Sequence, residues 1–243
     1  MSSLIVIGSS SRGNAYALLT SSGTLLIEAG CPLRNVRNLI RMEFVRGAIV
    51  SHRHMDHAKY VSDYALRFPV AAPKDVIDHY GLGPTAILLK DNTPQYVGGF
   101  FILPILVPHS DSDGRPCPCF AYLIQHQETG PVLFVTDTFN LPVIIPGIRH
   151  FIIEANYDDA ILDAMVRSGH TRPAQKERII LSHMSLDNCI ATLDQCGVKK
   201  ARSITLVHLS RDHSQGTMFR ERVLTSFGIP TFIARPSAVI NLS

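Results

Sequence analysis

Short runs of apolar residues, separated by polar turns that often contain glycine, recur along the whole chain. Runs of this length predict buried strands, whereas apolar residues at every third or fourth position predict helices. Strands are expected at residues 4–7, 16–20, 24–28, 47–50, 68–72, 98–108, 120–125, 132–136, 151–153, 179–181, 203–207 and 231–234. Helices are expected at residues 33–44, 58–67, 73–80, 158–168, 185–196 and 217–227. Because short strands and helices alternate, the pattern predicts an α/β protein.

Turn and cap residues support several of these boundaries. Pro32 lies where a proline can open a helix, and Ser185 can cap the start of another. Gly197 and Gly228 follow predicted helices, where glycine commonly ends the last turn. The polar, basic stretch 170–178 is expected to be a loop. No repeat or linker divides the sequence, so we expect one domain that spans residues 1–243.

Composition narrows the class of protein. Hydrophobic residues make up 46% of the 243 positions, which suffices for a sizeable core. No apolar stretch approaches the roughly 18 residues of a membrane span, and the N-terminus lacks the pattern of a signal peptide. Five cysteines is a low, odd number, which favours a reducing, cytoplasmic environment over a disulfide framework. The formal net charge of +3 is compatible with an anionic substrate.

Residues 51–57 carry the clearest chemical signal. They hold His52, His54, Asp56 and His57 between a predicted strand and a predicted helix. Residues two apart in an extended segment point the same way, so His52 and His54 can reach one metal ion. Lone histidines in a loop are usually just exposed, but four ligand-type side chains in six positions favour a metal site. Imidazole nitrogen and carboxylate oxygen suit zinc, manganese or iron.

Three further ligand-type residues follow predicted strands. They are His109, Asp137 and His208. In layered α/β folds the strand ends converge on one rim, where functional sites are built. Six or seven ligands are more than one zinc ion uses, so the sequence predicts two divalent transition-metal ions.

The segment His-x-His-x-Asp-His resembles the signature of the metallo-β-lactamase fold superfamily, and the order of the later ligands matches along nearly the whole chain. The resemblance implies an αββα sandwich of two mixed β-sheets with helices outside. It implies a first metal held by His52, His54 and His109, a second held by Asp56, His57 and His208, and a bridge at Asp137. Glu28 stands where the superfamily usually has aspartate, and would anchor the metal loop from behind.

Four other segments resemble the YycJ/WalJ-like branch of this superfamily. They are residues 8–14, 154–158, 182–185 and 207–210. That branch is associated with DNA exonuclease activity and is related to phosphoribosyl cyclic phosphodiesterases. The resemblance therefore implies a phosphodiesterase, with nucleic acid or a cyclic nucleotide as substrate. A cyclic phosphodiesterase acting on a small nucleotide or ribose cyclic phosphate is the alternative within phosphate chemistry.

A two-metal phosphodiesterase would use a hydroxide held by the ions to attack phosphorus. Asp56 and His183 are the expected catalytic residues, with His183 as the proton donor to the leaving oxygen. His183 follows the predicted strand 179–181, which should bring it to the rim; a surface histidine before a helix is the competing interpretation. The hydroxyl, guanidinium and amide groups of the loop 8–14 suit phosphate oxygens, and the expected substrate contacts are Ser9, Ser10, Arg12 and Asn14.

Other interpretations remain open at the level of sequence. A thioester or lactone hydrolase could use the same fold, and a non-catalytic metal protein could bind nucleic acid or a partner. Cys117 and Cys119 could hold a structural zinc, although no second cysteine pair lies nearby. Arginines 34, 37 and 41 could follow a nucleic-acid backbone but more often form a solvated helix face. The sequence leaves the oligomeric state open, a homodimer included.

Overall fold

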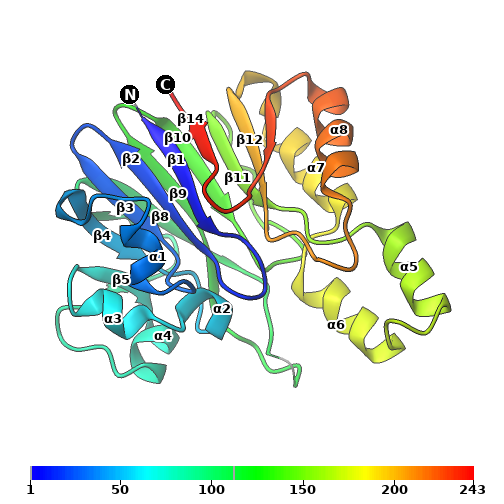
Figure 1. Ribbon diagram of the computed structural model, residues 1–243, viewed down its shortest axis with the longest axis horizontal. Coiled ribbons are helices and arrows are strands. Elements are labelled where there is room, and N and C mark those ends of the chain that lie inside the picture. The colour runs from blue at the N-terminus through cyan, green and yellow to red at the C-terminus, as the bar shows by residue number, and fades with distance from the viewer. Residues whose placement is uncertain (1, 112) are drawn as a thin grey trace.

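The computed structural model describes residues 2–111 and 113–243, and in this part of the chain it contains two seven-stranded sheets (Figure 1). Both sheets are mixed, with parallel and antiparallel neighbours. The first has the order β14 (Val239–Asn241), β1 (Ser3–Gly8), β2 (Ala15–Thr20), β3 (Gly23–Ile27), β4 (Val45–Ile49), β5 (Val70–Pro73), β6 (Ile87–Leu89). The second has the order β13 (Thr231–Ile233), β12 (Ser203–Val207), β11 (His150–Glu154), β10 (Gly130–Val135), β9 (Cys119–His126), β8 (Phe100–Val107), β7 (Gln95–Val97).

The two sheets pack face to face, and the period of two along each strand decides which residues lie between them. In β1, Leu4 and Val6 point into the core that the sheets share, where they join residues such as Phe134. Ile5 and Ile7, on the opposite face, belong to a separate apolar cluster beneath the helices. Each sheet therefore buries both of its faces, which explains why its strands are almost continuously apolar.

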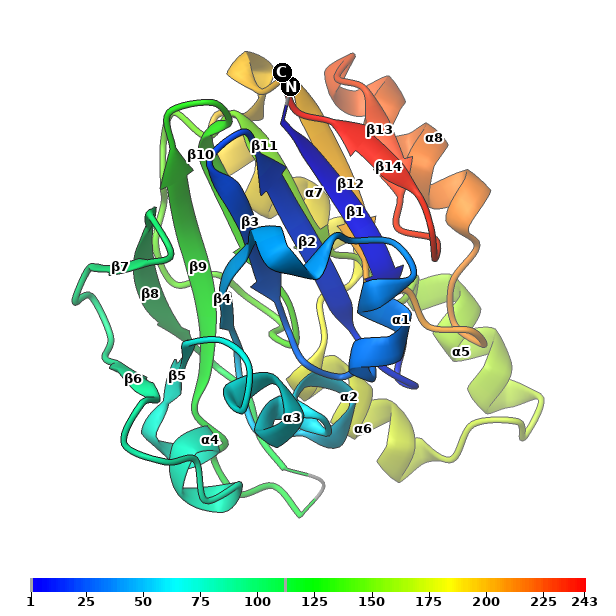
Figure 2. The ribbon, with the colours of Figure 1, turned by 60° about the vertical axis from the view of Figure 1, so that its left-hand side comes forward.

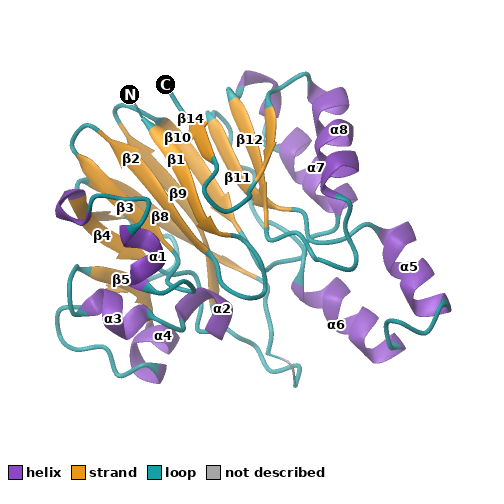
Figure 3. Cartoon of the chain, in the orientation of Figure 1, coloured by secondary structure: helices purple, strands orange, loops and turns teal. Residues whose placement is uncertain are grey.

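Helices cover the outer face of each sheet (Figures 2 and 3). The first sheet is covered by α1 (Leu33–Arg37), α3 (Val61–Ala65) and α4 (Lys74–His79). The second is covered by α7 (Leu186–Gln195) and α8 (Gly216–Phe227). The short helix α2 (Met55–Ala58) lies at the lower rim in Figure 1, and α5 (Asp159–Arg167) and α6 (Pro173–Ser182) extend beyond the strand ends. This arrangement is the predicted αββα sandwich.

Two predicted helices are shorter than expected. The helix at 33–44 ends at Arg37, and a separate 3₁₀ turn at Met42–Phe44 leads into β4. The arginine stripe 34, 37 and 41 is therefore not on one continuous helix, and all three side chains are exposed. The helix at 58–67 is divided because the backbone N–H of Tyr60 donates to the carbonyl of Ala29 on a neighbouring segment.

The prediction for residues 170–181 is wrong. Instead of a loop and a strand, residues Pro173–Ser182 form helix α6. Pro173 occupies the first turn of the helix, where a proline loses no hydrogen bond, and the apolar run at its end does not pair with a sheet. Three short strands, β6, β7 and β14, were not predicted, since three residues at a sheet edge leave almost no periodic signal. No helix in the described residues is long and apolar enough to cross a membrane.

Candidate metal centre

The predicted ligands lie at the carboxyl ends of strands from both sheets. Residues 51–57, the metal loop, follow β4, and His109 comes two residues after β8. Asp137 comes two residues after β10, and His208 comes directly after β12. Since these strand ends meet at one rim of the sandwich, the fold brings side chains more than 150 positions apart into contact: the His208 Nε2 and Asp56 Oδ2 atoms are 3.2 Å apart.

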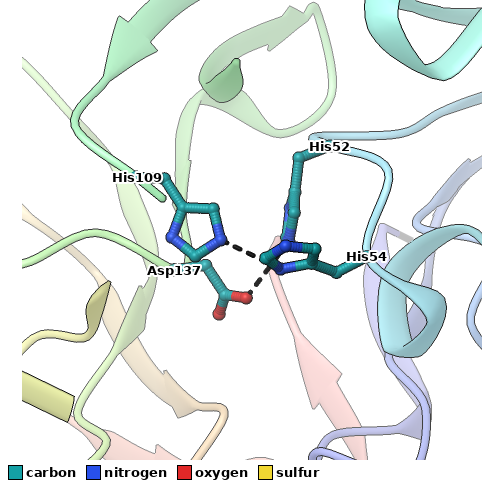
Figure 4. A group of neighbouring side chains, drawn as sticks. All are labelled: His52, His54, His109 and Asp137. Carbon is teal, nitrogen blue, oxygen red and sulfur yellow. Dashed lines mark hydrogen bonds and ion pairs between the residues drawn. The ribbon is translucent and has the colours of Figure 1, made fainter. Parts of the chain in front are cut away.

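A first cluster contains His52, His54, His109 and Asp137, whose ligand-type atoms all lie within 4.8 Å of one another (Figure 4). His54 Nδ1 and His109 Nε2 are 3.1 Å apart, and His52 Nε2 is 3.4 Å from Asp137 Oδ2. The His52 ring is fully buried, yet its Nε2 atom makes no hydrogen bond. A buried polar atom without a partner is rare in native proteins, and one aimed into a group of ligands fits a metal ion.

A second cluster contains Asp56, His57, Asp137 and His208. The His57 Nε2 atom is 3.3 Å from Asp56 Oδ2 and 3.1 Å from Asp137 Oδ2. The other oxygen of Asp137 is 2.8 Å from His208 Nδ1. Asp137 therefore belongs to both clusters, so the geometry suits a dinuclear site with one shared carboxylate.

Burial and charge in this region favour cations. Glu28, Asp137 and Glu154 are buried carboxylates, and Asp56 lies beside them. Burial disfavours the imidazolium form of His57, but the carboxylates of Asp137, Asp56 and Glu28 outweigh it and hold its pKa well above the usual range. Burial lowers the pKa of His109 to about 4, so its ring is neutral and has a lone pair for a ligand. Nitrogen and oxygen donors around a surplus of negative charge fit two divalent ions.

Three site residues have strained backbones. Glu28, Asp137 and His208 have φ angles of 67°, 49° and 53°, in the left-handed region that residues other than glycine rarely adopt. Each follows a strand and turns its side chain sharply toward the rim. Strain of this kind persists where surrounding structure enforces it, which is typical of functional sites.

Glu28 contacts the metal loop at Ser51 and His57. Its carboxylate accepts a hydrogen bond from the N–H of Ser51 at 3.2 Å, and its Oε1 atom is 3.5 Å from His57 Nδ1. Such contacts fix which ring nitrogen of a histidine faces a metal.

At Gly30 the backbone of the segment after β3 lies very close to the backbone of the metal loop. Its N–H donates to the carbonyl of Asn14, whose own N–H donates to the carbonyl of Asp56. A β-carbon at Gly30 would lie 1.8 Å from that Asp56 oxygen, so a side chain here must displace the metal loop.

We predict that Gly30→Ala lowers the free energy of unfolding by about 1–3 kcal/mol, the usual cost of overpacking, and lowers metal content at the Asp56 and His57 cluster. Thermal unfolding and elemental analysis measure the two effects. Gly83→Ala is the matched control, because a β-carbon there meets nothing within 4 Å. Wild-type metal content in Gly30→Ala would show that this close approach does not position the loop.

The predicted phosphate contacts in residues 8–14 have other partners. Ser9 accepts the N–H of His208 at 3.0 Å and the hydroxyl of Tyr16 at 2.9 Å. Buried Asn14 contacts the Asp56 carboxylate and His57 through its amide, and Ser10 bonds within the loop. Of these three residues only Asn14 contacts the metal loop, whereas Ser9 contacts the backbone of His208; Arg12 is exposed.

His183 reaches the centre by a different route from the predicted strand. It follows helix α6, and its Nδ1 atom is 2.9 Å from Glu154 Oε1. Burial disfavours the protonated ring, but the Glu154 carboxylate outweighs it and raises the pKa of His183. The same Glu154 oxygen is 2.7 Å from His208 Nδ1, so this carboxylate holds two histidines at once.

Glu154 was not predicted as a site residue. Its other oxygen accepts the N–H groups of Thr138 and Met184 at 3.3 and 3.1 Å, which fixes the carboxylate between the two histidines. A signal was present in the sequence: Glu154 ends a buried strand, in the same position as the predicted ligands.

A cavity of about 720 Å³ opens onto the two clusters. His54, Asp56, His109, Asp137, His183 and His208 all line it. Of the loop 8–14, Ser11 lines the cavity, whereas Ser9, Ser10, Arg12 and Asn14 do not. The cavity therefore joins the candidate metal centre to solvent, with His183 in its wall.

The two cysteines considered for a structural zinc lie in different surroundings. Cys119 Sγ is 3.7 Å from His52 Nδ1, and Cys117 groups with His54 and Asp111. Within residues 2–111 and 113–243, no cluster of metal-ligand type contains both cysteines, so the geometry does not support that zinc site.

Comparisons with solved structures identify the architecture. The chain matches YhfI from Bacillus subtilis, described as a metallo-β-lactamase fold protein, with a TM-score of 0.76 over 98% of both chains, at 18% identity. The chain has the metallo-β-lactamase fold. Zn²⁺-bound PqqB from Methylobacterium extorquens matches this fold too, with a TM-score of 0.73, 12% identity, and 99% and 100% of the two chains covered. A diphosphatase from the PhnP family has a TM-score of 0.66, 14% identity, and coverage of 100% and 98%.

Curated relatives extend along most of this metallo-β-lactamase-fold chain at low identity. Exodeoxyribonuclease YycJ from Bacillus anthracis is 24% identical over 237 residues, which cover 90% of this chain and 86% of the relative. Exodeoxyribonuclease WalJ from Streptococcus pneumoniae serotype 2 is 23% identical over 232 residues, which cover 86% and 82%. No family model matches the chain. These names and the fold support a metal-dependent hydrolase.

Proposed function

We propose that this chain is a dinuclear metal-dependent phosphodiesterase that acts as a nuclease on DNA. The observation that carries the proposal is the pair of clusters that share Asp137, beside a histidine held by a buried carboxylate in the wall of an open cavity. The exodeoxyribonuclease names of the relatives favour DNA over other phosphodiesters.

The residues divide into two proposed metal sites. His52, His54 and His109 would hold one ion, Asp56, His57 and His208 the other, and Asp137 would contact both. Zinc and manganese suit this donor set best, and iron also fits it. Two such ions, when bound, polarise a phosphate ester and lower the pKa of water. Glu28 Oε1 lies 3.5 Å from Nδ1 of His57, on the side of the ring opposite Nε2, and would keep Nε2 turned toward the site.

His183 is the proposed general acid. Because its Nδ1 atom faces Glu154, the opposite ring nitrogen is left for a substrate in the cavity. The carboxylate favours the protonated ring, so a proton is available for the oxygen that leaves phosphorus. Asp56 would act as a ligand that positions the reacting groups, and Asn14 keeps its carboxylate in place.

A substrate panel tests the proposal. Metal-reconstituted protein is incubated with single-stranded DNA, duplex DNA, RNA, cyclic nucleotides, bis-p-nitrophenyl phosphate and a thioester. We expect hydrolysis of DNA and of the activated phosphodiester, with Asp137→Asn as the inactive control. Turnover of a cyclic phosphate alone would favour the cyclic phosphodiesterase, and turnover of the thioester alone would contradict phosphate chemistry.

A further inference from the structure

Four arginines line the cavity, and only two of them form ion pairs with carboxylates. Arg53 is paired with Asp75 and Asp111, and Arg115 is paired with Asp113. Arg178 and Arg211 also line the cavity, but no described residue forms an ion pair or a side-chain hydrogen bond with either guanidinium. Since a carboxylate already neutralises the first two, the second two are the cations that remain for a ligand.

Arg178 and Arg211 line the same cavity as the proposed catalytic groups, and each is close in sequence to one of those groups. Arg178 is on α6, where residues 175, 178, 179 and 182 recur at helical spacing and all line the cavity. His183 follows that helix directly. Arg211 lies three residues after His208, on the loop that leads away from β12.

The surroundings of these arginines suit an anionic ligand. Helix α6 has no buried residue, so its cavity face is open. Gln175, Ser182 and Ser210 add polar groups to this wall, and Asp212 is the carboxylate next to Arg211. Arg178 is five residues from His183, about 7.5 Å along the helix axis. Arg178 therefore lines the cavity at some distance from His183, where another anionic group of the same substrate can meet it.

We propose that Arg178 and Arg211 bind a second phosphate, adjacent to the one that is cleaved. This inference rests on the proposed phosphodiesterase function and deepens it. It favours nucleic-acid strands, which carry a phosphate at every nucleotide, over a cyclic mononucleotide, which carries only one. Guanidinium groups suit this role because they bind phosphate through paired hydrogen bonds.

The test compares a substrate with several phosphates and a substrate with one. The variants are Arg178→Ala, Arg211→Ala and the double variant, and Arg37→Ala is the control, an exposed arginine outside this cavity. On a short labelled single-stranded DNA, we expect kcat/KM to fall about tenfold per arginine and about a hundredfold in the double variant. On bis-p-nitrophenyl phosphate, which has one phosphate, we expect a change of less than about twofold, and the control should match wild type on both.

A binding measurement separates this inference from the proposed function. Fluorescence anisotropy of the same DNA in the presence of chelator requires no turnover. The double variant should bind at least about tenfold more weakly than wild type, and its salt dependence should be shallower because fewer phosphate contacts remain. Equal binding by the double variant and wild type overturns the inference, as does an equal loss of activity on both substrates. If wild type hydrolyses no phosphodiester, the proposed function fails and the binding result alone decides the role of the arginines.

Discussion

Replacing Asp137 by alanine is expected to lower turnover of a phosphodiester by at least about a hundredfold, the scale seen when a group that organises a metal site is lost. The carboxylate belongs to both clusters, with one oxygen 2.8 Å from His208 Nδ1 and the other 3.1 Å from His57 Nε2. Its side chain is only 3% exposed. Water therefore has little access to replace the lost carboxylate as a ligand. Metal content should fall with activity, because neither proposed site is complete without it.

Asp137→Asn separates chemistry from folding. Asn tolerates the left-handed backbone that Asp137 adopts, with φ of 49°, better than alanine does. The shape of the side chain is kept and only the charge is lost. Both variants should remain folded by circular dichroism and lose activity after reconstitution with metal. Near wild-type turnover in either folded, remetallated variant would refute the shared role of Asp137.

Replacing His183 by alanine is expected to cost about 10²- to 10⁴-fold in rate on DNA, the usual contribution of a general acid. The proton matters most when the leaving oxygen is a poor leaving group. On bis-p-nitrophenyl phosphate, whose leaving group hardly needs a proton, the loss should be much smaller. Metal content should stay unchanged, since the proposed ligand sets do not include His183. His79→Ala, at an exposed histidine on α4, is the control.

Two results would reassign His183. An equal loss on both substrates would point to substrate positioning instead of proton transfer. A loss of metal would make His183 a ligand, which its group with Asp137, Glu154 and His208 allows geometrically. His208 would then need another role. Glu154→Gln offers a second measurement: if the carboxylate keeps His183 protonated, this variant should show the same dependence on leaving group.

The alternation of apolar strands and helices predicted an α/β protein and the cluster residues, whereas the αββα sandwich was implied by the resemblance to a superfamily. Apolar strands give a strong local signal, and ligand-type residues directly after them must meet at the rim once the sheets form. His109, Asp137 and His208 could each be found in this way without knowledge of their distances. The metal loop added four ligands in a single segment, and its order with the later residues resembles a known superfamily.

Helix α6 and several contacts between side chains far apart in the sequence were not predicted. The apolar run 179–181 resembles a strand in isolation, but Pro173 opens a helix that continues through it. Glu154 is a charged residue in a buried position, and only the structure shows that it holds both His183 and His208. Likewise, Ser9 and Asn14 resemble phosphate ligands in sequence, whereas their side chains bond to His208 and to the metal loop.

The central claim, a dinuclear centre, is tested most directly by counting ions. Protein stripped with a chelator is titrated with zinc or manganese, freed of excess metal, and analysed for bound ions per chain. The account predicts close to two equivalents for wild type, with a reduced number for Asp137→Asn and an unchanged number for His183→Ala. A stable value near zero in metal-supplemented, folded wild-type protein would contradict it.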